Sequence, residues 1–414
     1  MKRIAGACFV CVALLAATAG GSPITTEHFR INSTFAPAYI KVVGDSAETY
    51  YRYCRQWFFS KGWAQSVTVY YCQNEKQARQ LLEDNLHDIE AGERFYVPSV
   101  PAIYAYPQTG DGQQQYSVLF EQIARHFIEL NSPYAPQWFK EQLAYFLGHH
   151  ARIVKGKVQL IAVSPQERRT LTAAMDAGKR FSVKRLFVVR DEGFARWEEG
   201  HAFTQVFFQW LYDTGNLKSF LAEVARKGFS LDVLEATVKG SFGKINIALK
   251  DVLVAAGICD KYLLQAADAN SVTERRRALV KVLELKPDCQ AARLALAKVY
   301  SEQKDYGKCR EQLEYILQQP LCPESLGAAW LMANSYYKEK EYAKALGYYK
   351  QAWDYAALYP YRYRIAYQIA NCNYYLKNRL EAKVWYGRFL ESNWEPAKMK
   401  QQVAYANKYV NTPG

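Results

Sequence analysis

The sequence predicts a mixed α+β domain followed by an all-helical array of repeats. Three observations support this fold class. Segments with strand character alternate with helical segments before Gly110, and a helix–turn–helix pattern recurs from Pro287 onward. The chain also has 414 residues, of which 50% are hydrophobic, so it can bury a sizeable core and is not a disordered chain.

The first part of the chain is predicted to form a small sheet with helices. Residues 28–43 and 66–71 are rich in β-branched and aromatic residues and predict strands. A helix is expected between them, at about residues 47–60. A further helix is expected over 75–84, and PAIYAY (101–106) predicts another strand.

Two amphipathic helices are predicted next. The first carries an apolar face from Tyr116 to Leu130 and contains Phe120-Glu-Gln-Ile-Ala124. The second begins at Pro136, a residue suited to the first turn of a helix, and reads Pro-Gln-Trp138-Phe-Lys-Glu141-Gln-Leu-Ala. Pro-x-Trp-x-x-Glu-x-x-Ala is the most specific motif in this part of the chain.

This helix pair resembles the peptidase-MA-like group of gluzincin zinc metallopeptidases, in which an HExxH helix precedes a P-x-W-x-x-E-G-x-A helix. The resemblance covers residues 25–255 and implies a gluzincin-like fold. It places Glu121 at the general base and Glu141 at the third zinc ligand, with Gln142 replacing the family's glycine. His201 stands where the family's later helix often begins with a tyrosine near the substrate.

The residues that would complete a zinc site are replaced by apolar ones. Phe120 and Ala124 occupy the two histidine positions, whereas a zinc site needs about three protein ligands. We therefore expect a pseudoenzyme with no catalytic residues, no metal and no cofactor. A metallohydrolase with an unconventional site around Glu121, Glu141 and His201 stays open as the alternative.

Other histidines are poorly placed to restore that site. His126 lies about 200° around the helix from Ala124, and the adjacent His149 and His150 diverge by about 100°. His28 and His87 lie outside the motif. The sequence therefore favours a binding function for this domain.

The last third of the chain is repetitive. Equivalent positions recur at shifts of 36 and then 37 residues, and in each copy a small residue is followed by another twelve positions later. Small residues at these points let the two helices of a hairpin approach closely. The pairs are Ala297 and Cys309, Ala333 and Ala345, and Ala370 and Ala382.

This spacing resembles the tetratricopeptide repeat, although these copies are slightly longer and lack its tryptophan–leucine–glycine opening. The resemblance implies an all-α solenoid that binds proteins. The repeats are expected over 257–394, with a polar capping helix and tail over 395–414.

Tyrosines are the best candidates for ligand contact in the repeats. Of the 32 tyrosines, 18 lie from Tyr300 onward, and tyrosine gives a large contact area at low entropic cost. We expect a protein or peptide ligand, with groove residues Tyr300, Tyr336, Tyr337 and Tyr374.

Charge and the N-terminus indicate the cellular setting. The net charge of +13 is spread over both halves without a block of five or more like charges, which argues against nucleic acid. Lys2-Arg3, an apolar run and Ala17-Thr-Ala19 predict a signal peptide over 1–19. We therefore expect a chain without a membrane span, in the periplasm or outside the cell, as in exported bacterial proteins.

Seven cysteines follow the predicted signal peptide, and they do not show the spacing of a zinc finger. Export would permit disulfides. Cys54 and Cys72 are the nearest pair in the first half, and either a bridge between them or burial as small hydrophobic side chains fits the sequence.

Overall fold

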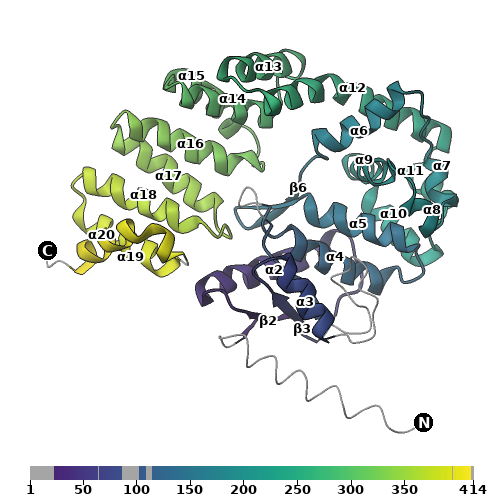
Figure 1. Ribbon diagram of the computed structural model, residues 1–414, viewed down its shortest axis with the longest axis horizontal. Helices are drawn as coiled ribbons and strands as arrows, with labels where there is room; N and C mark the ends of the chain where they lie inside the picture. Colours follow the sequence, from purple (N-terminus) through teal and green to yellow (C-terminus); the bar gives the residue numbers. More distant parts are fainter. Residues whose placement is uncertain (1–22, 64, 86–101, 109–113, 394, 412–414) are drawn as a thin grey trace, which may run out of the picture. The chain divides into compact units, whose positions relative to one another are not determined.

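The computed structural model describes residues 23–63, 65–85, 102–108, 114–393 and 395–411 (Figure 1). The predicted signal peptide and His87 lie outside these residues. The chain divides into two compact units, one formed by Met1–Ala135 and Phe139–Ala151 and the other by Pro136–Trp138 and Arg152–Gly414. No helix in the described part of the chain is long and apolar enough to cross a membrane.

The first unit contains a four-stranded mixed sheet in the order β1-β2-β3-β4. Its strands are β1 (Ile24–Thr25), β2 (Phe29–Ser33), β3 (Val67–Tyr71) and β4 (Ala102–Ala105). β1 runs antiparallel to β2, whereas the other two pairs are parallel, with Phe29 opposite Val67 and Val69 opposite Ile103. The helices of this unit are α2 (Pro37–Trp57), α3 (Glu75–Asn85), α4 (Ser117–Asn131) and most of α5 (Gln137–His149).

The expected strand over 28–43 was wrong beyond Ser33. Pro37 begins α2 instead, because proline fits the first turn of a helix, where its missing N–H is not needed. The helix then buries one face through Tyr39, Ile40, Val43 and Ala47. The other expected elements of this region, at 66–71, 75–84 and 101–106, correspond to β3, α3 and β4.

The sheet separates Cys54 from Cys72. Tyr71 contacts Tyr39 of α2, with the ring centroids 6.1 Å apart, whereas Cys72 packs with Ala78 of α3 and Tyr104 of β4. Successive side chains of an extended strand point to opposite faces, so the two cysteines lie on opposite sides of the sheet. The seven cysteines that the structure describes are all free thiols, and a Cys54–Cys72 bridge is absent.

The second unit is almost entirely helical. It begins with a two-stranded sheet of β5 (Ala151–Val154) and β6 (Lys157–Leu160), of which Ala151 belongs to the first unit. Seven helices follow: α6 (Pro165–Asp176), α7 (Val183–Val188), α8 (Asp191–Ala195), α9 (Gly200–Asp213), α10 (Leu217–Lys227), α11 (Leu231–Val238) and α12 (Phe242–Asp268). α12 continues through Gly257 without a break.

Consecutive helices from α12 onward pack as antiparallel pairs, as predicted for a solenoid (Figure 1). The remaining elements are α13 (Val272–Leu285), α14 (Gln290–Glu302), α15 (Tyr306–Gln318), α16 (Glu324–Lys338), α17 (Tyr342–Tyr355), α18 (Arg362–Tyr375), α19 (Arg379–Ser392), the 3₁₀ turn η1 (Pro396–Met399) and α20 (Lys400–Asn411). All six of the small residues predicted to lie between paired helices are fully buried.

The same turn joins the helices of three successive pairs. Lys304, Lys340 and Lys377 occupy the left-handed region at φ values of 61°, 63° and 62°. The N–H of each lysine and that of the next residue donate back to carbonyl oxygens of the preceding helix, as in the Schellman motif. The 36- and 37-residue periods of the sequence are therefore also periods of backbone conformation.

A second contact repeats inside two of the pairs. The hydroxyl of Tyr349 donates to Oδ1 of Asn334 over 2.6 Å, and that of Tyr386 donates to Oδ1 of Asn371 over 2.8 Å. Each bond joins residues 15 positions apart and links the two helices of one pair. Both tyrosines are fully buried, so the bond also satisfies a polar group in the core.

Candidate functional site

The segment Phe120–Ala124, which takes the place of the zinc-peptidase HExxH motif, lies in the first unit. Phe120 is buried and stacks on Tyr50, with the ring centroids 4.2 Å apart and an interplanar angle of 10°. Ala124, one helical turn later, is also fully buried. The two positions that correspond to histidines in the family pattern therefore belong to an apolar core.

Glu121 projects from the same helix into a polar contact. Oε1 accepts a hydrogen bond from Nη2 of Arg125 at 3.1 Å, and Oε2 lies 2.9 Å from Nε2 of His149. Burial favours the neutral carboxyl, but the hydrogen bonds and charges of His149 and Arg125 outweigh it and lower the pKa of Glu121. Glu121 is therefore ionised at neutral pH, with both oxygens engaged.

A close approach of α4 and α5 brings His149 to Glu121. A Cβ added at Gly148 would lie 2.3 Å from the backbone nitrogen of Glu121, so only glycine fits at this crossing. The His149 ring is held in turn by stacking on Tyr145, with the centroids 4.0 Å apart. The signal that could have indicated this contact is Gly148, a glycine inside a predicted helix.

The other two candidate site residues are not part of this contact. Glu141 is half-buried in α5, two turns before Gly148 and thus about 10 Å away along the helix axis. His201 belongs to the second unit, where its Nε2 lies 3.5 Å from Oε1 of Glu167. His126, as expected, faces away from the motif and contacts Trp63.

A second polar group in the first unit could hold a metal ion. Ligand atoms of Glu27, His28 and Glu48 all lie within 4.8 Å of one another. Nδ1 of His28 is 2.8 Å from Oε2 of Glu48, and Nε2 of His28 is 3.9 Å from Oε1 of Glu27. His28 was not expected at a site because it lies outside the motif, and the sequence carries no spacing signal that links it to Glu48.

The buried Glu48 also has a structural role. Its Oε1 accepts hydrogen bonds from the Thr26 hydroxyl and the His28 N–H, each over 2.6 Å. Burial raises the pKa of this carboxyl, but the bonds from Thr26 and His28 lower it by more. Glu48 thus holds the β1–β2 connection against α2 and orients the His28 ring, as a carboxylate behind a metal-binding histidine does.

The repeats carry a cluster of contacting tyrosines, which we call the tyrosine cluster. Tyr374 lies 5.4 Å from Tyr375 between ring centroids, and Tyr375 stacks on Tyr342 at 4.4 Å. Tyr374, Tyr375 and Tyr405 are 44%, 49% and 40% exposed. The members are Tyr337, Tyr342, Tyr374, Tyr375, Tyr405 and Tyr409.

The structure brings together two of the four expected groove tyrosines. Tyr337 and Tyr374 both contact Tyr375. Tyr336 instead stacks on Tyr348, with the Arg310 guanidinium 4.7 Å from its ring centroid, and Tyr300 lies under Lys308. Sequence reasoning missed Tyr375 and Tyr405, because the repeat pattern does not show how far each ring projects.

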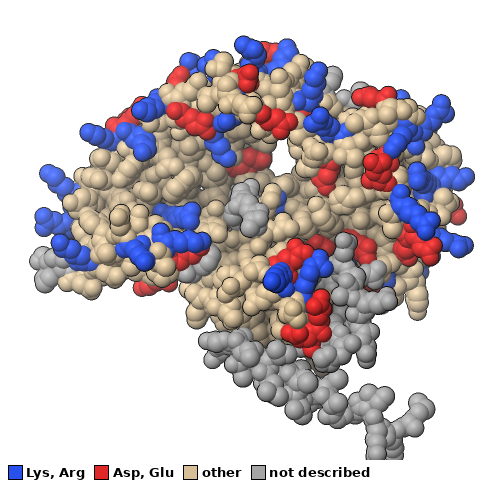
Figure 2. All heavy atoms as spheres, viewed as in Figure 1, with Lys and Arg blue, Asp and Glu red and all other residues tan. Residues whose placement is uncertain are grey.

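Charge on the visible face agrees with the diffuse pattern of the sequence. In Figure 2, basic and acidic side chains are interspersed, and neither sign forms a continuous patch over that face.

A comparison with models of protein families finds no matching family, and a comparison with curated proteins finds no matching sequence.

Proposed function

We propose that this chain is an exported, non-catalytic protein-binding protein. Its tetratricopeptide-like helical array would hold a partner protein or peptide, and its gluzincin-like domain would no longer cleave peptides. The observation that carries the proposal is the tyrosine cluster, which exposes several large rings at neighbouring positions of a regular helical array. Exposed aromatic groups of this kind are typical of binding surfaces.

The buried motif supports the loss of catalysis. A stacked phenylalanine and a buried alanine offer no metal ligand, and both oxygens of Glu121 are engaged by Arg125 and His149. The same engagement disfavours the alternative metallohydrolase around Glu121, Glu141 and His201. His201 also has a carboxylate partner of its own, Glu167.

Partner capture tests the binding function. The chain is immobilised and exposed to a native envelope extract, and a captured protein is then purified for direct titration. We expect the double variant Tyr374→Ser with Tyr375→Ser to lose this binding. The matched control is Leu380→Ser with Val384→Ser, which removes two exposed apolar side chains from α19. Equal loss in both variants, or in neither, would contradict a role of the tyrosine cluster.

Peptide cleavage and metal content test the loss of catalysis. We expect no cleavage of a mixed peptide library and no zinc that depends on Glu121 or His149. Zinc lost on His28→Gln would be assigned to the Glu27–His28–Glu48 group, and would not bear on the peptidase motif. Cleavage that disappears in Glu121→Gln would overturn the proposal, because that variant removes the carboxylate a general base needs.

Export has its own test. Mass spectrometry of the native protein should find an N-terminus near Gly20, after removal of the signal peptide. Retention of Met1 in the protein isolated from the envelope would contradict a cleaved signal peptide.

A further inference from the structure

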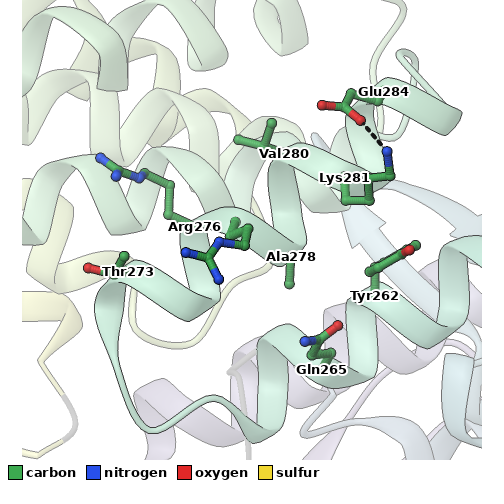
Figure 3. A pocket seen from close by; sticks show the side chains of 9 residues that line it. Tyr262, Gln265, Thr273, Arg276, Ala278, Val280, Lys281 and Glu284 are labelled. Atoms are coloured by element: carbon green, nitrogen blue, oxygen red, sulfur yellow. Dashed lines mark hydrogen bonds and ion pairs between the residues drawn. The ribbon is translucent and has the colours of Figure 1, made fainter.

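A pocket of about 430 Å³ lies between α12 and α13, away from the tyrosine cluster (Figure 3). Figure 3 shows side chains of both helices around it. α12 contributes Tyr262 and Gln265, and α13 contributes most of the rest, including Arg276, Arg277, Val280 and Glu284.

The pocket has an excess of positive charge. Among its lining residues Glu284 supplies the carboxylate, and Lys281 neutralises it over 2.7 Å. The guanidinium groups of Arg276 and Arg277 form no hydrogen bond or ion pair with any residue that the structure describes. Their neighbour Arg275, in contrast, pairs with Glu302 at 3.2 Å. Two guanidinium groups are therefore available for a ligand.

The rest of the lining suits a ligand with some apolar character. Val280 is 37% exposed, and Ala278 and the Tyr262 ring add apolar surface beside it. A second pocket of about 780 Å³, between α12 and α6, shares Tyr262 and Gln265 with the first. The two pockets thus adjoin across α12 and give room for an extended segment, which a small inorganic anion would not fill. Asp176, Asp260 and Asp268 line the second pocket, so the carboxylates of an acidic segment belong in the first pocket and its uncharged residues in the second.

We propose that the α12–α13 pocket binds an acidic peptide segment of a partner protein, with Arg276 and Arg277 pairing with its carboxylates. This inference rests on the proposed function as a protein-binding protein and names the chemistry of one partner segment. Guanidinium groups match carboxylates in a bidentate geometry, and an apolar side chain of the peptide would lie on Val280 and Tyr262.

A fluorescein-labelled peptide of alternating glutamate and leucine is the probe, titrated against the full-length chain by fluorescence anisotropy. We expect Arg276→Gln with Arg277→Gln to weaken its binding by about tenfold or more, as expected for the loss of charge-assisted hydrogen bonds. The control, Arg190→Gln with Arg196→Gln, removes the same charge from exposed positions of the same unit and should leave the affinity within about twofold.

Three results would overturn the inference. If both double variants bound the peptide equally weakly, the peptide would be attracted by the net charge of the chain alone. Equally tight binding of a glutamine–leucine peptide would show that carboxylates are not recognised. Displacement of the probe by inorganic phosphate, but not by sodium chloride of equal ionic strength, would assign the pocket to a small anion.

The tyrosine variant separates this inference from the proposed function. Tyr374→Ser with Tyr375→Ser should bind the acidic probe as the unmodified chain does, because the pocket lies on other helices. Probe binding with no partner captured through the tyrosine cluster would contradict the proposed function and leave the pocket intact. Partner capture through the cluster with no probe binding would contradict the inference alone.

Discussion

The core of the first unit and the core of the helical array are held together by different kinds of contact. In the first unit, the Tyr50 hydroxyl donates to the carbonyl of Leu147, 97 positions away, over 2.8 Å. In the array, the Tyr349–Asn334 and Tyr386–Asn371 bonds each span 15 positions. One core depends on single contacts between distant segments, whereas the other repeats a local contact. Substitutions should therefore act in distinct ways in the two regions.

The largest change in the free energy of unfolding is expected at the crossing of α4 and α5. Gly148→Ala places a Cβ against the backbone of Glu121, and should lower the free energy of unfolding of the first unit by about 3 kcal/mol. Gly347→Ala is the control in the array, because its Cβ would meet nothing within 4 Å. It should raise stability by up to about 1 kcal/mol through better helix propensity.

Hydrogen exchange of α4 and α17 during urea titration measures both variants in the full chain. Equal effects of the two alanines would mean that α4 and α5 do not meet at Gly148.

The next effect is a dependence of the stability of the first unit on pH, through His126. Burial lowers the pKa of His126 from 6.5 to about 4, so the unfolded chain binds a proton at a higher pH than the folded chain does. Stability contributed by the neutral imidazole is complete above pH 6.5 and is lost as the pH falls towards 4. The loss is about 3 kcal/mol. Urea unfolding of α4, followed by hydrogen exchange at several pH values, checks this.

His126→Gln should remove this dependence, since glutamine does not titrate. His201→Gln is the control, because its ring is 42% exposed and lies in the other unit. A pH dependence that survives in His126→Gln would have to come from other groups.

A smaller effect tests the equivalence of the repeats. Tyr349→Phe and Tyr386→Phe each remove a buried hydrogen bond to an asparagine, and each should cost about 1 kcal/mol. Tyr306→Phe should change nothing, because the Tyr306 hydroxyl bonds to no residue that the structure describes. Urea unfolding measures the loss in the free energy of unfolding for each variant. Losses that differ several-fold between Tyr349→Phe and Tyr386→Phe would show that the two helix pairs are not equivalent.

The smallest effect lies in the repeated turn. Lys340→Gly relieves a left-handed backbone at φ 63° and should raise the free energy of unfolding by up to about 1 kcal/mol. Lys350→Gly, in the interior of the next helix, should lower it by about the same amount. The opposite signs, read from thermal unfolding, distinguish a turn position from a helix position.

The same contrast explains what could be predicted from the sequence. The helix pairs of the array were predictable because a small residue and its partner twelve positions later lie on adjoining helices. In the first unit, the run at 28–43 has β-branched residues such as Ile40 and Val43, but they are buried on one face of a helix that Pro37 begins. Tertiary burial overrode local propensity there.

The candidate site was predictable only in part. An apolar face was expected at Phe120 and Ala124, and both are buried. The partner of Glu121 was not expected, because His149 reaches it only through the close approach at Gly148. The pairing of His28 with Glu48 likewise depends on how β2 and α2 pack, which no local pattern encodes.

The repeated lysine turn gives the array a natural unit of length. Because Lys304, Lys340 and Lys377 adopt one conformation at equivalent points, a segment of 36 or 37 residues between two of these turns carries a complete set of neighbour contacts. Duplication or excision of such a segment would join two equivalent turns and keep every helix packed against an equivalent helix. An insertion of a few residues inside a helix would instead rotate the following side chains out of their contacts. Change in the number of whole units is therefore the route by which the length of this region can vary while its fold is kept.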